Sequence, residues 1–119
     1  MTTQDIAKRL VELCRHSEFE TAQKELFAPD AISIEPYATK EFEKETKGLP
    51  AIIEKGHKFD SMVEELHSTT ISEPLVTATS IAFILTMDMK MKGSDRMKMS
   101  ELCVYQLKDG KIIAEQFFM

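Results

Sequence analysis

Two glutamates in this sequence could carry acid–base chemistry. Glu101 stands between Met99 and Cys103 in an alternating stretch that predicts a β-strand, so it shares a strand face with apolar side chains. A carboxylate on such a face loses its water, which raises its pKa and lets it exchange protons near neutral pH. Glu35 precedes Pro36 at the predicted end of a shorter strand. Each has a plainer alternative: Glu101 lies near an opening to solvent or pairs with a basic side chain, and Glu35 is a solvated strand-end acid.

Other polar side chains could orient a ligand beside Glu101. Tyr105 and Gln116 are predicted on the same sheet face and could donate hydrogen bonds, although a buried tyrosine usually finds a partner within the protein. His57, on a predicted helix, is a candidate for the mouth of the same site or an ordinary surface side chain. The three histidines, at positions 16, 57 and 67, lack the spacing of a metal site, so we predict no metal and no cofactor.

Two turns position these residues on a sheet. Asp109-Gly110 is typical of a two-residue hairpin turn, and Gly93-Ser94-Asp95 of a three-residue loop. They separate three predicted strands, residues 75–91, 97–107 and 111–119. The turns set the register, so we expect the cross-strand pairs Met91 with Met97, Met89 with Met99, Phe83 with Tyr105, Tyr105 with Ala114, Cys103 with Gln116 and Glu101 with Phe118.

This register sorts the strands into an inner, core face and an outer face. Besides Glu101, Tyr105 and Gln116, the inner face carries the apolar residues that we predict to bind a ligand: Phe83, Met87, Met99, Cys103 and Phe118. Five methionines between residues 87 and 99 would give this face a soft, adaptable lining. The outer face is polar around one apolar patch, formed by Ile84, Leu102, Val104, Ile113 and Phe117.

The remaining chain predicts helices packed on the sheet. Apolar residues at helical spacing predict a first helix up to about His16 and a second that begins with a Ser17–Glu20 capping box and is closed by Pro29. A short strand over residues 31–35 and a polar loop over residues 37–47 follow. A third helix begins at Pro50, and residues 65–73 form a further strand. This order indicates an α+β fold.

The composition fits one globular domain over residues 1–119, with 43% hydrophobic and 29% charged residues. A net charge of −5 without a basic stripe argues against a nucleic-acid partner. The sequence has no apolar run long enough for a membrane span and no recognisable signal peptide, so we expect a cytoplasmic protein without a membrane partner. Cys14 and Cys103 are expected to be buried thiols rather than a disulfide framework.

Several short motifs resemble one known superfamily. They are Leu26-Phe27-Ala28-Pro29-Asp30-Ala31, Lys47-Gly48 followed by Ala51-Ile52-Ile53, and Asp109-Gly110-Lys111-Ile112 with Glu115-Gln116-Phe117-Phe118. With the order of the elements, they resemble the SnoaL-like branch of the nuclear-transport-factor-2-like superfamily across nearly the whole chain. The resemblance implies a cone-shaped α+β fold, with three helices packed on a curved antiparallel sheet around a conical cavity. It also implies dimerisation through the outer sheet face.

Ketosteroid isomerases share this fold, so the resemblance can be tested residue by residue. An alignment without gaps places their general base on Glu35, their oxyanion tyrosine on Val11 and their oxyanion aspartate on Cys103. Valine and cysteine cannot replace these two oxyanion donors. Because an oxyanion hole supplies the largest single catalytic contribution, that particular reaction is not expected here.

Three functional hypotheses follow. The first is a homodimer that binds a small apolar molecule in its cone and uses the outer patch as its interface. The second is an enzyme of the cyclase, isomerase or dehydratase kind, with Glu101 or Glu35 as proton shuttle and Tyr105 and Gln116 orienting the substrate. The third is an interaction module whose cone is filled by its own methionines. The sequence identifies no particular ligand, pathway or partner protein.

Overall fold

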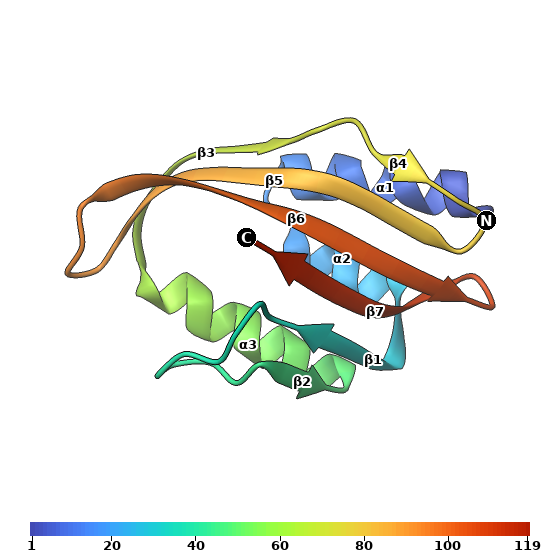
Figure 1. Cartoon of the computed structure of the whole chain (residues 1–119), viewed down its shortest axis with the longest axis horizontal. Coiled ribbons are helices and arrows are strands. Elements are labelled where there is room, and N and C mark those ends of the chain that lie inside the picture. The colour runs from blue at the N-terminus through green and yellow to red at the C-terminus, as the bar shows by residue number, and fades with distance from the viewer.

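The computed structural model describes residues 1–119 as three helices packed on one curved, open sheet (Figure 1). The helices are α1 (Thr3–Arg15), α2 (Phe19–Leu26) and α3 (Leu49–Met62). The strands are β1 (Phe27–Ile34), β2 (Glu45–Lys47), β3 (Val63–Ile71), β4 (Leu75–Val76), β5 (Ser80–Met91), β6 (Arg96–Lys108) and β7 (Lys111–Phe118). The predicted α+β fold class is confirmed.

The sheet is mixed rather than wholly antiparallel. Its strands lie in the order β2-β1-β7-β6-β5-β3, with β4 paired to β5. β1 and β7 run parallel, and the other neighbours are antiparallel. Because β1 comes early in the chain and β7 ends it, this pairing brings Ser33 beside Glu115. The resemblance implied an antiparallel sheet, so the parallel β1–β7 pair departs from that expectation.

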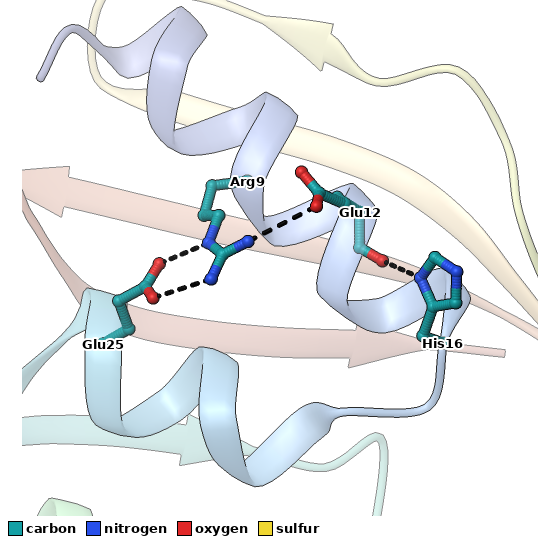
Figure 2. A network of polar contacts seen from close by, with 4 residues as sticks. All are labelled: Arg9, Glu12, His16 and Glu25. Atoms are coloured by element: carbon teal, nitrogen blue, oxygen red, sulfur yellow. Dashed lines mark hydrogen bonds and ion pairs between the residues drawn. The ribbon is translucent and has the colours of Figure 1, made fainter.

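An ion-pair network joins the first two helices (Figure 2). Arg9 Nε and Nη2 donate to the two carboxylate oxygens of Glu25, over 2.7 and 3.0 Å, and Arg9 Nη1 lies 3.4 Å from Glu12. At the end of α1, His16 Nδ1 lies 2.9 Å from the carbonyl oxygen of Glu12. These contacts are exposed, so they orient the helix pair more than they stabilise it.

The second helix and the strands after it differ from the prediction at their ends. The Ser17–Glu20 capping box is absent, because Ser17 has a φ of 57° and its hydroxyl bonds to Thr69 over 2.9 Å. Pro29 lies inside β1 instead of closing the helix. The predicted loop over residues 37–47 contains the short strand β2, and the predicted strand over residues 75–91 is divided into β4 and β5.

The β5–β6 hairpin is two residues out of the predicted register. Met89 pairs with Met97 instead of Met99, so five residues rather than three lie between the last paired residues. Side chains alternate with a period of two, and a shift of two therefore leaves every residue on its predicted face. Glu101 and Tyr105 still share the inner face with Phe83.

A β-bulge at Ile113 reverses the faces of the last strand. The observed pairs are Leu107 with Ile112, Gln106 with Ala114, Tyr105 with Glu115 and Cys103 with Phe117, which leaves Ile113 as an extra residue. The predicted inner positions of Gln116 and Phe118 are therefore wrong, and Glu115 and Phe117 occupy the inner face. On the outer face, Phe118 replaces Phe117 in the predicted apolar patch.

The core lies between the helices and the inner face of the sheet. Its fully buried apolar side chains include Ile6, Leu10, Ile52, Ile81, Met89 and Ile112. Burial of each such side chain contributes about 1.5–3 kcal/mol, far more than an exposed ion pair. Cys14 and Cys103 are buried and unbridged, as predicted. None of the helices has the length and apolar character needed to cross a membrane.

Two glycines should respond in opposite ways to the same substitution. Gly110 has a φ of +76° in the β6–β7 turn, so Gly110→Ala should lower the free energy of unfolding by about 1 kcal/mol. Gly56 lies in α3, and a Cβ there would meet no atom within 4 Å. Gly56→Ala should therefore raise the free energy of unfolding by about 0.5–1 kcal/mol. Urea unfolding measures both, and shifts of the same sign would contradict this account.

Candidate functional site

A cavity of about 700 Å³ lies between the helices and the inner face of the sheet. All three helices and the strands β3, β5, β6 and β7 contribute to its wall. Aromatic side chains supply much of its apolar surface, namely Phe19, Tyr37, Phe42, Phe59, Phe83, Tyr105 and Phe117. A cavity of this size and lining suits a small molecule.

Three glutamates and one lysine in the inner part of this cavity come from different elements. Glu35 follows β1, Glu101 lies on β6, Glu115 on β7 and Lys55 on α3. Lys55 Nζ donates to Ser33 Oγ over 2.6 Å, and this hydroxyl donates to Glu115 Oε2 over 2.6 Å. Lys55 Nζ also lies 3.7 Å from Glu35 Oε1. No group of three or more His, Cys, Asp or Glu side chains in the structure is arranged to hold a metal ion.

Local periodicity explains why Ser33 and Lys55 face inward. Ala31, Ser33 and Glu35 alternate along β1 and its continuation, and the first two are completely buried. Lys55 follows the buried Ile52 by three residues, so both lie on the face of α3 that meets the sheet. The Lys55 side chain is only 15% exposed, and its hydrogen bond to Ser33 and its ion pair with Glu35 compensate for the lost hydration.

The carboxyl group of Glu101 is strongly perturbed by its burial in the cavity wall. Burial raises its pKa to about 7, and repulsion from Glu35 and Glu115 acts in the same direction, while Lys55 opposes it. Burial also raises the pKa of Glu115, although Ser33 and Lys55 favour its charged form. Glu101 is therefore close to half protonated at neutral pH and could either donate or accept a proton.

Tyr105 lies in the cavity wall in contact with two phenylalanines. Its ring centroid is 5.4 Å from that of Phe83 and 6.4 Å from that of Phe27. Burial raises the pKa of Tyr105 well above its ordinary value, so its hydroxyl remains protonated. It can therefore contribute a neutral hydrogen bond to a ligand, but no charge.

The residues nearer to solvent make the cavity entrance acidic. His57 pairs with Glu20, and this contact raises the pKa of His57. Glu20 also lies 3.0 Å from Lys24. The acidic side chains of this outer part are Glu18, Glu20, Asp60 and Glu64.

The structure brings seven of the ten predicted site residues together around the cavity: Glu35, His57, Phe83, Met87, Met99, Glu101 and Tyr105. Three lie elsewhere. Cys103 is completely buried in the core, and Gln116 and Phe118 face outward because of the bulge at Ile113. A ligand-binding role for any of these residues stays a prediction.

The sequence interpretation missed the polar contacts of Lys55, Ser33 and Glu115 beside the cavity, and the inward position of Phe117. Alternation along β1 could have identified Ser33, and helical spacing from a buried isoleucine could have identified Lys55. Glu115 and Phe117 gave no such signal, because strict alternation from the Asp109-Gly110 turn places both on the outer face.

Comparison with known proteins gives a consistent result over the whole chain. A family model described as a SnoaL-like domain matches residues 1–119. A structure from Mesorhizobium loti, provisionally described as a SnoaL-like polyketide cyclase, is 28% identical, covers 100% of both chains and has a TM-score of 0.91. Among curated proteins, no match is found.

Two further structures share the fold at lower identity. A Catenulispora acidiphila protein with a ketosteroid isomerase-like fold, in complex with trimethylamine, is 16% identical, with a TM-score of 0.75 and coverage of 99% of this chain and 87% of that chain. TerC, co-crystallised with polyporic acid, is 11% identical, with a TM-score of 0.79 and coverage of 98% and 90%. At these identities the likeness concerns the fold alone.

Direct titration tests the environment of Glu101. Its carboxyl carbon, followed by ¹³C NMR, should titrate near pH 7, and Glu35→Gln should lower that pKa because it removes a repelling charge. Glu65→Gln, on an exposed residue outside the cavity wall, is the matched control and should leave the pKa unchanged. A Glu101 carboxyl that titrates near 4.5 would show that the group is solvated.

The same burial makes stability depend on pH. Glu101 has a pKa of about 7 when folded and near 4.5 when unfolded, so the folded state binds more protons between these values. Its contribution to the free energy of unfolding therefore falls as pH rises through this window and stays lower above it. Glu101→Gln should remove this component, which urea unfolding at about pH 5 and pH 8 would measure. An unchanged pH dependence in the variant would contradict the assignment.

Proposed function

This chain belongs to the SnoaL-like domain family, and we propose that it binds a small, largely apolar molecule in the cavity between its helices and its sheet. The cavity itself carries this proposal. Its volume of about 700 Å³ is typical of small-molecule sites, and its apolar wall is interrupted by a few convergent polar groups. Two proteins of the same fold were crystallised with small molecules, trimethylamine in one and polyporic acid in the other, which supports the same use of the fold here.

A second candidate function is proton transfer on the bound molecule, in a reaction of the cyclase, isomerase or dehydratase kind. Glu101 favours it, because an acid with a pKa of about 7 exchanges protons efficiently near neutral pH. Glu35 is the alternative shuttle, and its carboxylate lies 3.7 Å from Lys55 Nζ in the same cavity. Tyr105 could orient the substrate, whereas Gln116 faces away from the cavity. The polyketide-cyclase description of the Mesorhizobium loti protein is consistent with this class.

The third hypothesis, a ligand-free interaction module, has less support. It requires the methionines to fill the cone. Met89 is buried in the core, and Met87 and Met99 line the wall, yet a volume of about 700 Å³ stays open beside them.

We also propose that the protein is a homodimer that pairs through the outer face of its sheet. Ile84, Leu102 and Phe118 are direct cross-strand neighbours on β5, β6 and β7. Their exposed fractions are 49%, 41% and 46%, so they form a continuous apolar row on a surface with no helix over it. A second copy of the chain would remove this row from water.

A cavity-filling substitution tests small-molecule binding. Neutral aromatic fragments should shift the backbone amide NMR signals of Met87, Tyr105 and Phe117 more than those of the outer residue Val104. Gly56→Phe adds a ring at a position of the cavity wall where a Cβ meets no neighbour, so it should weaken binding about tenfold or more. Fragments that bind Gly56→Phe and the natural protein equally well would place the site elsewhere.

Charge substitution on the apolar row tests dimerisation. Leu102→Lys should convert a dimer to a monomer in sedimentation velocity, because it would bury an unpaired charge in the interface. Met97→Lys is the matched control, because Met97 lies on the same strand with a similar exposed fraction, 42% against 41%, but on the opposite face. A natural protein that sediments as a monomer at micromolar concentration would exclude the dimer.

A further inference from the structure

We propose that the ligand of this cavity is a cation, an amine or quaternary ammonium compound with an apolar body. This inference rests on the proposed small-molecule function and names the ligand class. Its basis is the distribution of charge and of aromatic rings in the cavity wall. A neutral or an anionic molecule of the same size would meet the same apolar surface but the wrong electrostatic environment.

Acidic side chains are concentrated in the cavity wall beyond what the composition requires. The whole chain has 20 acidic and 15 basic residues, close to balance. The wall contains a single lysine, Lys55, besides His57, and its acidic residues are Glu18, Glu20, Glu35, Asp60, Glu64, Glu101 and Glu115. Lysines outside the wall pair with two of the outer acids, Lys24 with Glu20 and Lys90 with Glu64, and the excess of negative charge rests on the others. A cleft lined by one sign of charge, with low-dielectric walls, attracts ions of the opposite sign and repels others.

The one lysine of the wall does not balance the inner carboxylates. Lys55 Nζ already contacts Ser33 Oγ at 2.6 Å and Glu35 Oε1 at 3.7 Å, and Ser33 connects it to Glu115. Glu101 makes no side-chain hydrogen bond, and the negative charges of Glu35 and Glu115 act on it. The inner cavity therefore has a carboxyl group whose charged form lacks a direct partner, and a ligand ammonium group would supply it.

The aromatic rings of the wall are suited to the same charge. A ring face attracts a cation within about 6 Å, more strongly where water is excluded. Two rings of the wall already contact cations of the protein itself. Lys55 Nζ lies 5.7 Å from the centroid of Phe117, and Lys58 Nζ lies 5.0 Å from that of Phe42. Rings and carboxylates together could enclose an alkylammonium group and its apolar substituents.

The pH dependence of binding separates a cationic ligand from a neutral one. A permanent cation favours ionised Glu101, so its affinity should rise as pH increases through 7. A neutral hydrogen-bond acceptor favours the protonated acid, so its affinity should fall over the same pH range. The charged groups that face Glu101 are Glu35 after β1, Glu115 on β7 and Lys55 on α3. The two carboxylates also favour a cation, and the lysine opposes it.

Three probes with the same phenylethyl body test the proposal: trimethyl(2-phenylethyl)ammonium, the neutral ketone 4-phenyl-2-butanone and the anion 3-phenylpropionate. Titration into ¹⁵N-labelled protein, followed by amide NMR signals, gives each dissociation constant between pH 6 and pH 8. The ammonium probe should bind about tenfold or more tightly than the ketone, with the carboxylate weakest, and should bind more tightly as pH rises.

Variants that remove one negative charge show which carboxylates produce the preference for a cation. Glu101→Gln should weaken the ammonium probe about fivefold or more and reduce its pH dependence, with little effect on the ketone. His57, in the outer wall, also titrates and accounts for the pH dependence that remains. Glu35→Gln should weaken it in the same direction, which keeps the test valid if the first variant folds poorly. Glu65→Gln changes the net charge by the same amount outside the cavity and should leave all three affinities unchanged.

The possible results distinguish this inference from the function on which it rests. A ketone that binds as tightly as the ammonium probe, or an ammonium affinity unaffected by Glu101→Gln, would overturn the cation preference while small-molecule binding stands. If none of the three probes shifts signals of the cavity residues, both the inference and the proposed function fail.

Discussion

The hydrogen-bond chain from Lys55 through Ser33 to Glu115 holds together the parts of the structure that form the cavity. It joins α3, β1 and β7, and it gives a partner to a carboxyl group that is only 5% exposed. Removal of one member of a buried charged pair costs about 3–5 kcal/mol, because the other is left without compensation. The third helix is therefore fixed over the parallel strand pair, and the cavity remains between this helix and the meander.

The same hydrogen bonds also affect the chemistry of Glu101. Lys55 contacts Ser33 and Glu35 but makes no ion pair or hydrogen bond with Glu101. Burial therefore raises the pKa of Glu101 to about 7, and repulsion from Glu35 and Glu115 acts in the same direction. Glu115, by contrast, has two groups that favour its ionised form. Burial nevertheless raises the pKa of Glu115 as well, so the two acids differ in their partners. The position of one lysine thus decides which carboxyl groups of the cavity have a partner: Lys55 contacts Glu35 directly and Glu115 through Ser33, and it makes no ion pair or hydrogen bond with Glu101.

The sequence predicted the fold class and brought seven of its ten candidate site residues to the cavity. The two-residue period of side chains along a strand explains both the correct and the incorrect assignments on the sheet. The β5–β6 register was wrong by two residues, which left Glu101, Tyr105 and Phe83 on the expected face. The bulge at Ile113 shifted β7 by one residue, which exchanged Glu115 for Gln116. No turn residue or alternation in the sequence announces this bulge. It appears only once the pairing of β7 with β6 on one side and β1 on the other is known.

The bulge links the two surfaces on which function would depend. It turns Phe117 inward, where its ring lies 5.7 Å from Lys55 Nζ, and it turns Phe118 outward, where it extends the row of Ile84 and Leu102. Strict alternation would have placed Gln116 and Phe118 on the inner face and Phe117 in the outer row. Deletion of Ile113 would therefore alter the cavity and the outer face at once. Substitutions on β5 or β6 can change one face alone, so the two proposed roles are separable everywhere except in β7.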